Sequence, residues 1–451
     1  MAPQVVVSPR PGRYLPGRFP PPAGRPKDPR PRRTQRDGTL VVTRSVLSAP
    51  SRPRLRARPA VPPAVGGRRS PLAIVFVTVL LDLVGFGIVI PLLPLYAQGF
   101  GAGAVAVASL LAVYSAMQFL FAPGWGRLSD RYGRRPVLLV GLFGSAFSYL
   151  LCGFAGSVAA LLAARALGGL MGANVGVAQA YVADVSAPER RAKAMGMIGA
   201  AFGLGFILGP AIGGALAGFG TAVPFFVAAA LTLGNALLAL WWLPESLPPE
   251  ARDTAPRTPG LAARLRGWTD RRLRAPYSAA LLLTLAFAGA EATLSLWAYQ
   301  RWRMGPREVA FLFAYLGLIS VLAQGWGVGR LTRRLGERRT AILGLAVLAG
   351  GMGALAIAPS LAALGVALAA LAFGQGTASP SLSSWVSRAA GPAEQGKVLG
   401  VYQSLGALGR VAGPMGGGFA FAHLGISAPY LAGAALAAGA LGVLAFAEGA
   451  R

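Results

Sequence analysis

The chain has 451 residues, of which 54% are hydrophobic and 13% are charged, and its formal net charge is +28. A soluble domain usually carries about 25% charged residues, so this composition argues against an ordinary soluble enzyme or binding domain. Long apolar stretches with few charges predict transmembrane helices, which satisfy their backbone hydrogen bonds internally. We therefore expect an all-α membrane protein.

Twelve apolar segments are long enough to cross a bilayer. They lie at about 72–97, 105–124, 137–155, 158–182, 194–216, 223–243, 276–299, 308–328, 340–358, 361–386, 397–419 and 428–447. We expect two six-helix bundles, residues 71–243 and 276–451, joined by a polar linker at 244–275 whose later part has the pattern of a short amphipathic helix.

Positive charge is distributed unevenly between the connecting segments. Residues 1–70 contain 16 Lys and Arg, and 22 of the other 27 lie after the even-numbered helices. The segments after helices 1, 3, 5, 9 and 11 carry no charged residue. This bias predicts a multi-pass protein with both termini in the cytoplasm. It also argues against a nucleic-acid-binding face, which would not alternate with apolar runs.

The first 70 residues have 15 Pro and 15 Arg and no apolar periodicity. Such a segment cannot bury enough apolar surface to fold, and we expect a disordered basic cytoplasmic tail that contacts anionic lipid head groups. Two alternatives are a wrongly assigned start, with the protein beginning near Val65, and an organellar transit peptide.

Two motifs recur at half the chain length. The charged segment Gly126–Pro136, GRLSDRYGRRP, recurs 203 residues later as Gly329–Arg339, GRLTRRLGERR. The glycine pattern at 196–214 recurs 204 residues later at 400–418. Two motifs with matching displacements indicate two related halves. Their charges differ, since Arg333 occupies the position of Asp130 and Asp184 corresponds to Arg388.

Four ionisable residues lie within the predicted helices, each within about four residues of a helix midpoint: Asp82, Arg165, Glu291 and Arg410. An ionisable group near the bilayer centre costs at least ~2.5 kcal/mol, so it normally faces a cavity or the bundle interior. Similar depth on four helices predicts a shared polar cavity. We expect Asp82, and with it Glu291, to exchange a proton, and Arg165 to pair with Asp82 so that release of the pair couples protonation to motion. A carboxylate that is paired only for packing is the alternative for Asp82.

These residues carry a resemblance to a known family. The segment 126–136 resembles the loop between helices 2 and 3 of the major facilitator superfamily, and the 196–214 pattern resembles the helix 5 motif of its antiporters. Arg165 is similarly placed to that superfamily's helix 4 arginine. Asp82 with the following Gly-rich run is similar to helix 1 of tetracycline-efflux-like drug/proton antiporters. The resemblance covers about 72–447 and implies a two-bundle, alternating-access exporter with its substrate cavity between the bundles.

Three groups of site residues follow. Polar residues expected in the substrate cavity are Tyr114, Gln118, Asn174, Gln179, Gln403 and Arg410. For the uncharged members the alternative is an interhelical hydrogen bond worth ~1 kcal/mol. A gating or assembly role is expected for Gly126, Asp130, Arg131, Gly133, Arg134 and Arg135. Close helix packing is expected for Gly205, Gly209, Pro210, Gly213 and Gly214.

The expected function is proton-coupled export of amphipathic, drug-like small molecules across the plasma membrane by a monomer. One cysteine and one histidine leave no metal site and no nucleophile–base pair, so no cofactor, metal or enzymatic activity is expected. The alternatives are a proton-coupled importer of a small solute and, from another class, a non-transporting membrane scaffold or sensor. Four charges within the membrane argue against the scaffold, which would have little reason to retain them.

Overall fold

The computed structural model describes residues 70–172, 174–249, 252, 272–389 and 395–446, all within one compact unit, Val61–Arg451. The basic tail, most of the expected amphipathic helix and the chain's last five residues lie outside the described residues. Every regular element in the described part is helical.

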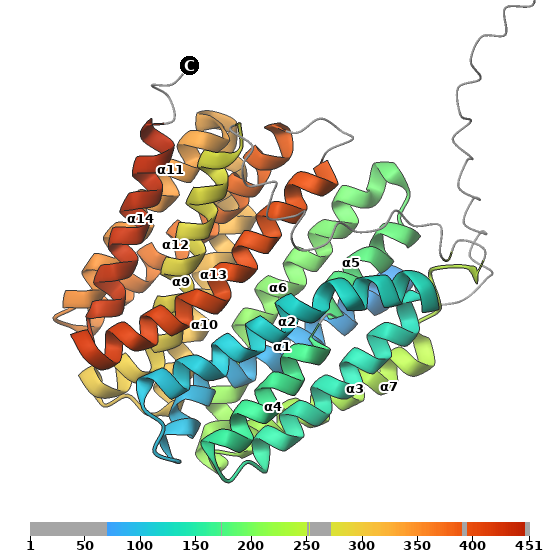
Figure 1. Cartoon of the computed structure of the whole chain (residues 1–451), viewed down its shortest axis with the longest axis horizontal. Helices are drawn as coiled ribbons and strands as arrows, with labels where there is room; N and C mark the ends of the chain where they lie inside the picture. Colours follow the sequence, from blue (N-terminus) through green and yellow to red (C-terminus); the bar gives the residue numbers. More distant parts are fainter. Residues whose placement is uncertain (1–69, 173, 250–251, 253–271, 390–394, 447–451) are drawn as a thin grey trace, which may run out of the picture. The chain divides into compact units, whose positions relative to one another are not determined.

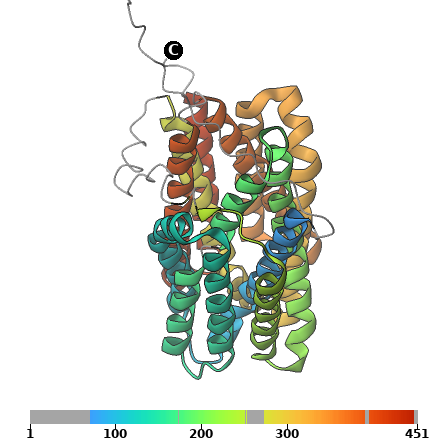
Figure 2. The ribbon, with the colours of Figure 1, turned by 90° about the vertical axis from the view of Figure 1, so that its right-hand side faces the viewer.

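The first half contains seven α-helices and one short 3₁₀ helix (Figure 1). They are α1 (Pro71–Gln98), α2 (Ala104–Tyr132), α3 (Arg134–Gly153), α4 (Val158–Met171), α5 (Asn174–Val185), α6 (Pro188–Leu216), η1 (Ala217–Phe219) and α7 (Val223–Trp242). The second half contains α9 (Arg274–Trp302), α10 (Pro306–Leu322), the π-helix η4 (Ala323–Gly327), α11 (Val328–Ile357), α12 (Leu361–Ala389), α13 (Gln395–Leu424) and α14 (Ala428–Phe446). The helices run roughly along a common direction (Figure 2).

Ten helical stretches in the described residues are long and apolar enough to span a membrane. One of them, Pro306–Ile357, has 52 residues, roughly 78 Å of helix, which is more than twice the ~30 Å core of a bilayer. A non-helical residue, Gly336 with φ 77° and ψ 165°, interrupts it, so it makes two crossings. The ten stretches therefore make eleven crossings. The 30-residue α13, which is not among the ten, makes the twelfth. The expected twelve crossings in two bundles are confirmed.

The charged motif is less of a loop than the sequence suggests. Helix α2 continues to Tyr132, and only Gly133 separates it from α3. Gly133 has φ 107° and ψ 160°, and its counterpart Gly336 has φ 77° and ψ 165°. This backbone region is essentially restricted to glycine. Both copies of the motif therefore reverse the chain at a single glycine.

Two other boundaries differ from expectation. The fourth predicted helix is divided into α4 and α5, with Gly172 outside both. Helix α6 begins at Pro188, six residues before the predicted start, because proline is favoured in the first helical turn. The polar segment before residue 194 is therefore helical.

A π-helix marks where the two halves differ in length. In α2 the run Gly124-Trp125-Gly126 is followed directly by Arg127, whereas in the second half the run Gly325-Trp326-Gly327 is followed by Val328 and Gly329 before Arg330. The π-helix η4 ends at Gly327, directly before these two residues. Trp125 donates to the Leu170 carbonyl at 2.6 Å, whereas Trp326 is exposed and stacks with Arg330.

Glycines allow equivalent close packing inside each bundle. Helix α1 packs against α6, and a Cβ at Gly209 would lie 2.6 Å from the Cα of Gly87. Helix α9 packs against α13, and a Cβ at Gly417 would lie 2.6 Å from the Gly289 carbonyl oxygen. The duplicated glycine pattern thus produces a duplicated helix pair. Small residues at such positions allow backbones to approach within van der Waals contact.

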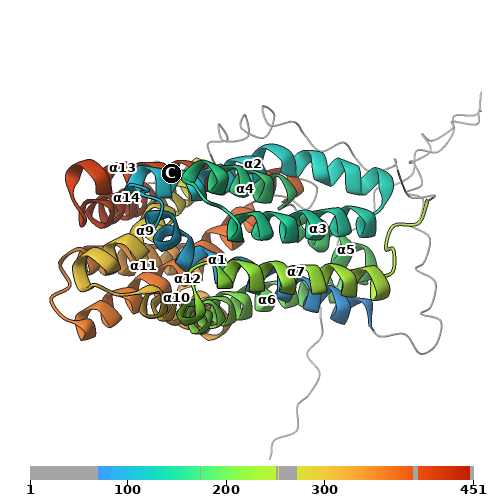
Figure 3. The same ribbon diagram turned by 90° about the horizontal axis from the view of Figure 1, so that it is seen from below.

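The two bundles meet along two helix pairs, α2 with α13 and α6 with α10, and α1 also contacts α9 (Figures 1 and 3). Gly418 of α13 lies against Ala108 of α2, and Gly214 of α6 against Ala310 of α10. Ser295 of α9 donates to the Pro91 carbonyl of α1 at 2.9 Å. These contacts lie toward the side opposite Gly133 and Gly336. We call the side with those glycines the basic side.

Candidate functional site

Asp82 lies near the middle of α1. Gly85 allows α1 to approach Thr232 of α7, and Gly87 allows it to approach α6. Asp82 is partly exposed, and its Oδ1 accepts a hydrogen bond from Nδ2 of Asn174 at 3.2 Å. Asn174 is the first residue of α5. A carboxylate is thus held at the start of a helix, where the backbone dipole stabilises negative charge.

Arg165 on α4 is 1% exposed, and its Cζ lies 4.2 Å from the centre of the Tyr114 ring. A desolvated guanidinium over an aromatic face is stabilised by about 2 kcal/mol. The Nε and Nη1 atoms of Arg165 have no hydrogen-bond partner. The expected ion pair between Asp82 and Arg165 is not formed in this structure. Tyr114 lies within electrostatic range of both charges instead.

The other expected cavity residues of the first bundle divide into two kinds. Gln118 on α2 donates from Nε2 to the Gly172 carbonyl at 2.6 Å, and Asn174 donates to Asp82. Both therefore make interhelical hydrogen bonds. Gln179 on α5 is exposed. The structure brings Asp82, Asn174 and Tyr114 together with Arg165 and Gln118, while Gln179 is not part of that group of contacts.

The second bundle holds the other pair of intramembrane charges. Glu291 lies on α9 and Arg410 on α13, close enough for their charges to interact. The described residues show no ion pair between them within 4 Å. Tyr402, about two turns before Arg410 on α13, donates to the Ser379 carbonyl at 3.0 Å and is also within electrostatic range of Arg410. Gln403 is exposed.

Aromatic rings line the first bundle beside Asp82. The ring of Phe86 lies 5.4 Å from that of Tyr114 and 6.4 Å from that of Phe206. All three residues are partly exposed and come from three different helices, α1, α2 and α6. Sequence reasoning missed Phe86 and Phe206, since nothing distinguishes them from the apolar residues around them.

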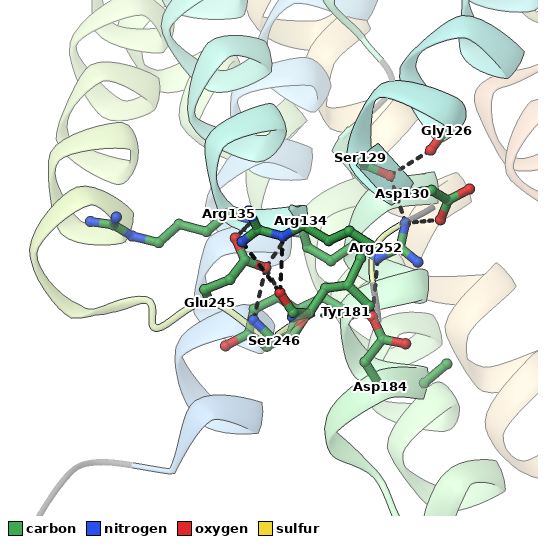
Figure 4. Close-up of polar contacts among 12 residues, drawn as sticks. Gly126, Ser129, Asp130, Arg134, Arg135, Tyr181, Asp184, Glu245, Ser246 and Arg252 are labelled. Carbon is green, nitrogen blue, oxygen red and sulfur yellow. Dashed lines mark hydrogen bonds and ion pairs between the residues drawn. The ribbon is translucent and has the colours of Figure 1, made fainter. Parts of the chain in front are cut away.

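A network of ion pairs and hydrogen bonds lies on the basic side (Figure 4). The Arg134 guanidinium contacts Asp130 at 2.6 Å and Asp184 at 3.0 Å, and it donates to Ser129 Oγ at 2.7 Å. Arg134 thus joins the end of α2 and the start of α3 to the end of α5. Of the expected gating residues, Gly126 accepts from Ser129, whereas Arg131 is exposed and stacks on its neighbour Tyr132.

Glu245 completes this network from the segment after α7. Its carboxylate accepts from the backbone N–H groups of Arg134 at 2.8 Å and Arg135 at 3.2 Å. These N–H groups belong to the first turn of α3 and have no partner within the helix, so a carboxylate there is favoured by hydrogen bonding and by the helix dipole. Arg135 also donates to the Leu240 carbonyl at 2.6 Å. Sequence reasoning missed Glu245, which stands 110 residues from Arg135 in the chain.

The second bundle has one ion pair at the equivalent positions, with the charges reversed. Glu337 occupies the position of Arg134 and Arg388 that of Asp184, and the two form an ion pair at 2.9 Å. Arg333 occupies the position of Asp130. The sequence positions of a cation and two carboxylates in the first half are thus occupied by a carboxylate and two arginines in the second, of which Arg388 pairs with Glu337.

The expected helix 5 residues lie at helix contacts. Gly205, Gly209 and Gly213 face α1, where added Cβ atoms would lie against Leu83, Gly87 and Ile88. Gly214 faces Ala310 of α10, and Pro210 lies beside Gly87. The glycine motif therefore forms one contact within the bundle and one between the bundles.

No group of three or more potential metal ligands occurs among the residues that the structure describes. A crevice of about 170 Å³ lies between α9, α13 and α14, lined by small and apolar residues. It contains none of the four intramembrane charges, so the candidate site is defined by those charges and not by this crevice.

Comparison with known proteins identifies the family. The sequence pattern of the Major Facilitator Superfamily matches residues 75–414, and a second match covers 277–450. The class C tetracycline resistance protein of Escherichia coli is 34% identical over 354 residues, which cover 76% of this chain and 88% of that protein. Major facilitator superfamily domain-containing protein 10 of Bos taurus is 34% identical over 420 residues, covering 80% and 88%.

Solved structures agree with this assignment. The crystal structure of the human organic anion transporter MFSD10 (TETRAN) is 29% identical and superposes with a TM-score of 0.65, covering 83% of this chain and 98% of that one. The nucleoside transporter NupG, at 13% identity and a TM-score of 0.71, shares the fold. The matched proteins are transporters and not enzymes. The chain is a multi-pass membrane transporter that belongs to the Major Facilitator Superfamily.

Proposed function

We propose that this transporter exports amphipathic small molecules in exchange for protons, by alternating access between its two bundles. The observation that carries the proposal is the position of Asp82. Its carboxylate lies inside a membrane span, is partly exposed, and stands beside the aromatic residues Phe86, Tyr114 and Phe206. A titratable group next to an apolar surface is suited to coupling a proton to a drug-like ligand.

The difference in charge between ionised and protonated Asp82 would couple proton binding to movement of the helices. When Asp82 is ionised, the Asn174 amide donates to a carboxylate, and such a charge-assisted bond is roughly twice as strong as a neutral one. Protonation removes an intramembrane charge and weakens that bond, so the two forms favour different arrangements of the helices. Glu291 beside Arg410 is proposed as a second group that takes part.

The proposed direction of transport and the proposed orientation in the membrane rest on two further arguments. Relatives named for tetracycline resistance favour export of a drug. The arginine-rich connections favour an arrangement with the basic side and both termini in the cytoplasm, in the plasma membrane. We place the bundles at 71–243 and 276–451 with the linker at 244–275, and we propose that a monomer is the transporting unit.

Transport of an organic anion is the second candidate. Arg165 is buried with its Nε and Nη1 unpartnered, so it can bind a carboxylate that enters the first bundle. An MFSD10 structure, described as that of an organic anion transporter, is among the similar proteins. Coupled import of a small solute would use the same residues in the opposite direction, and uptake measurements would detect it.

The test is proton movement in proteoliposomes loaded with a pH-sensitive dye. Tetracycline, a panel of lipophilic cations and a fluorescent organic anion are added in turn to the wild-type chain, to Asp82→Asn and to Glu308→Gln. Glu308 is an exposed carboxylate in the first turn of α10 and serves as the matched control.

We expect drug-evoked proton movement with the wild type and Glu308→Gln, and none with Asp82→Asn. A response to the organic anion alone would favour the second candidate. Exchange that persists at full rate in Asp82→Asn would overturn the proposal.

A further inference from the structure

We propose that α5 transmits the state of Asp82 to the ion-pair network on the basic side, and that Asn174 is the positioning residue through which it does so. The inference rests on the proposed role of Asp82 in proton exchange. Its basis is that the two ends of one short helix carry the two polar networks of the first bundle.

Helix α5 is separate from α4. Helix α4 ends at Met171, Gly172 has ψ 25° and lies outside both helices, and α5 begins at Asn174. Two carbonyls at the end of α4 and just after it accept side-chain donors from α2: Trp125 Nε1 donates to Leu170 and Gln118 Nε2 to Gly172, each at 2.6 Å. Carbonyls at a helix end require such partners when they are buried. The interruption is therefore stabilised by specific residues of α2.

The first end of α5 is fixed to Asp82. Asn174 is buried, and its Oδ1 occupies space that a Cβ at Gly141 of α3 would fill. Its Nδ2 is thereby directed toward Asp82. Loss of the negative charge on Asp82 would weaken both this bond and the attraction to the helix N-terminus. The titratable groups within range of Asp82 on other helices are Tyr114 and Tyr149, and Arg165 is within range of the same two tyrosines.

The second end of α5 is fixed to the basic-side network. Asp184, the residue before the last, pairs with Arg134 at 3.0 Å and lies 3.5 Å from Ser246 Oγ. Tyr181, one turn earlier, donates to the Pro244 carbonyl at 2.8 Å. These bonds attach α5 to the start of α3 and to the segment that follows α7 (Figure 4).

A helix of 12 residues is about 18 Å long and moves as a unit because its backbone bonds are internal. A displacement of α5 by about 1 Å away from Arg134 and Pro244 would lengthen the bonds at Asp184 and Tyr181 beyond hydrogen-bonding distance. Since α4 is not continuous with α5, such a displacement need not move α4. Asp82 and the basic-side network are thereby mechanically linked without direct contact.

Amide hydrogen exchange of the full chain in lipid nanodiscs tests this inference, because it does not depend on transport. Asp82→Asn at constant pH represents the uncharged form. We expect amides at 181–185 and in the first turn of α3 to exchange about tenfold faster in Asp82→Asn than in the wild type, the size expected when a bond to a charged group is lost. Asn174→Ala should produce a similar increase. Gly176→Ala, on the same helix with nothing within 4 Å of the added methyl group, should not.

The double variant Asp82→Asn/Asn174→Ala decides the matter. If Asn174 is the link, Asp82→Asn has little further effect in the Asn174→Ala background. An effect of full size in that background, or unchanged exchange at 181–185 in folded Asp82→Asn, would overturn the inference. If Asp82→Asn abolishes proton exchange in proteoliposomes but leaves these amides unchanged, the inference fails while the proposed function stands.

Discussion

Reversal of the three charges around Arg134 is the sharpest test of the basic-side network. Arg134, Asp130 and Asp184 have side chains that are 11%, 26% and 14% exposed. Breaking a buried ion pair by changing one partner costs about 3–5 kcal/mol when burial is complete. Because these groups keep some exposure, we expect Arg134→Glu to lower the free energy of unfolding by about 3 kcal/mol. It removes two ion pairs and places three carboxylates together.

The second bundle shows how the loss can be repaired. Arg333, Glu337 and Arg388 occupy the equivalent positions with opposite signs. The triple variant Asp130→Arg/Arg134→Glu/Asp184→Arg transfers that pattern to the first bundle. We expect it to recover all but about 1 kcal/mol, because both attractions are restored. The double variant without the change at Asp130 should recover less, since the introduced glutamate would still face the Asp130 carboxylate.

The assay is unfolding of each variant in mixed micelles titrated with a denaturing detergent, followed by tryptophan fluorescence. Drug-evoked proton movement in liposomes serves as the second measurement. The reasoning would be refuted by a triple variant no more stable than Arg134→Glu. That result would mean that the network depends on the shape of the arginine fork and not on alternating charge.

Three further substitutions probe packing and bonding. Gly209→Val should lower the free energy of unfolding by about 2–3 kcal/mol, because its Cβ would lie 2.6 Å from Gly87 Cα and α1 would have to move; the yield of monodisperse protein and the same titration would report it. Trp125→Phe removes the donor to the Leu170 carbonyl and should cost about 1–2 kcal/mol, measured as a lower thermal midpoint. Arg388→Ala should cost less than about 1 kcal/mol in that titration, because its side chain is 73% exposed.

The sequence is informative about depth in the membrane but not about direction around a helix axis. Apolar run lengths and the duplicated motifs predict twelve crossings and two related bundles, and both are confirmed. The same reasoning places Asp82 and Arg165 at similar depth and therefore predicts that they pair. In the structure Asp82 bonds to Asn174 and Arg165 stacks on Tyr114. Which neighbour a side chain meets depends on helix rotation, which hydropathy does not specify.

Long-range partners explain the other differences. Gly168, Gly169 and Gly172 predict close packing equally well with or without an interruption of the helix. The interruption depends on Gln118 and Trp125, which lie 54 and 45 residues from the carbonyls that they bind. Similarly, Arg134 meets Asp130 four residues earlier in the same motif, but nothing near 126–136 in the sequence indicates that Asp184 and Glu245 complete the network. A charged motif can be located by its pattern, whereas its partners are set by tertiary packing.

The contact between the bundles on the side opposite the basic side leads to a final prediction about transport. Ser109 Oγ of α2 lies 3.6 Å from Met415 Sδ of α13, and Met415 is 40% exposed. The single native cysteine, Cys152, is buried. Ser109→Cys/Met415→Cys should therefore react selectively with a short bifunctional thiol reagent containing a cleavable disulfide.

Alternating access requires these two helix ends to separate, so the cross-linked protein should lose drug-evoked proton movement. Cleavage of the reagent should restore it. Each single-cysteine variant, treated with the same reagent, controls for modification without a link. Full transport by a protein shown on gels to be completely cross-linked would mean that α2 and α13 stay together throughout the cycle. The opening on that side would then have to occur between α6 and α10 alone, with α2 and α13 as the hinge. Such a one-sided opening is not expected, because the duplication makes the two helix pairs equivalent.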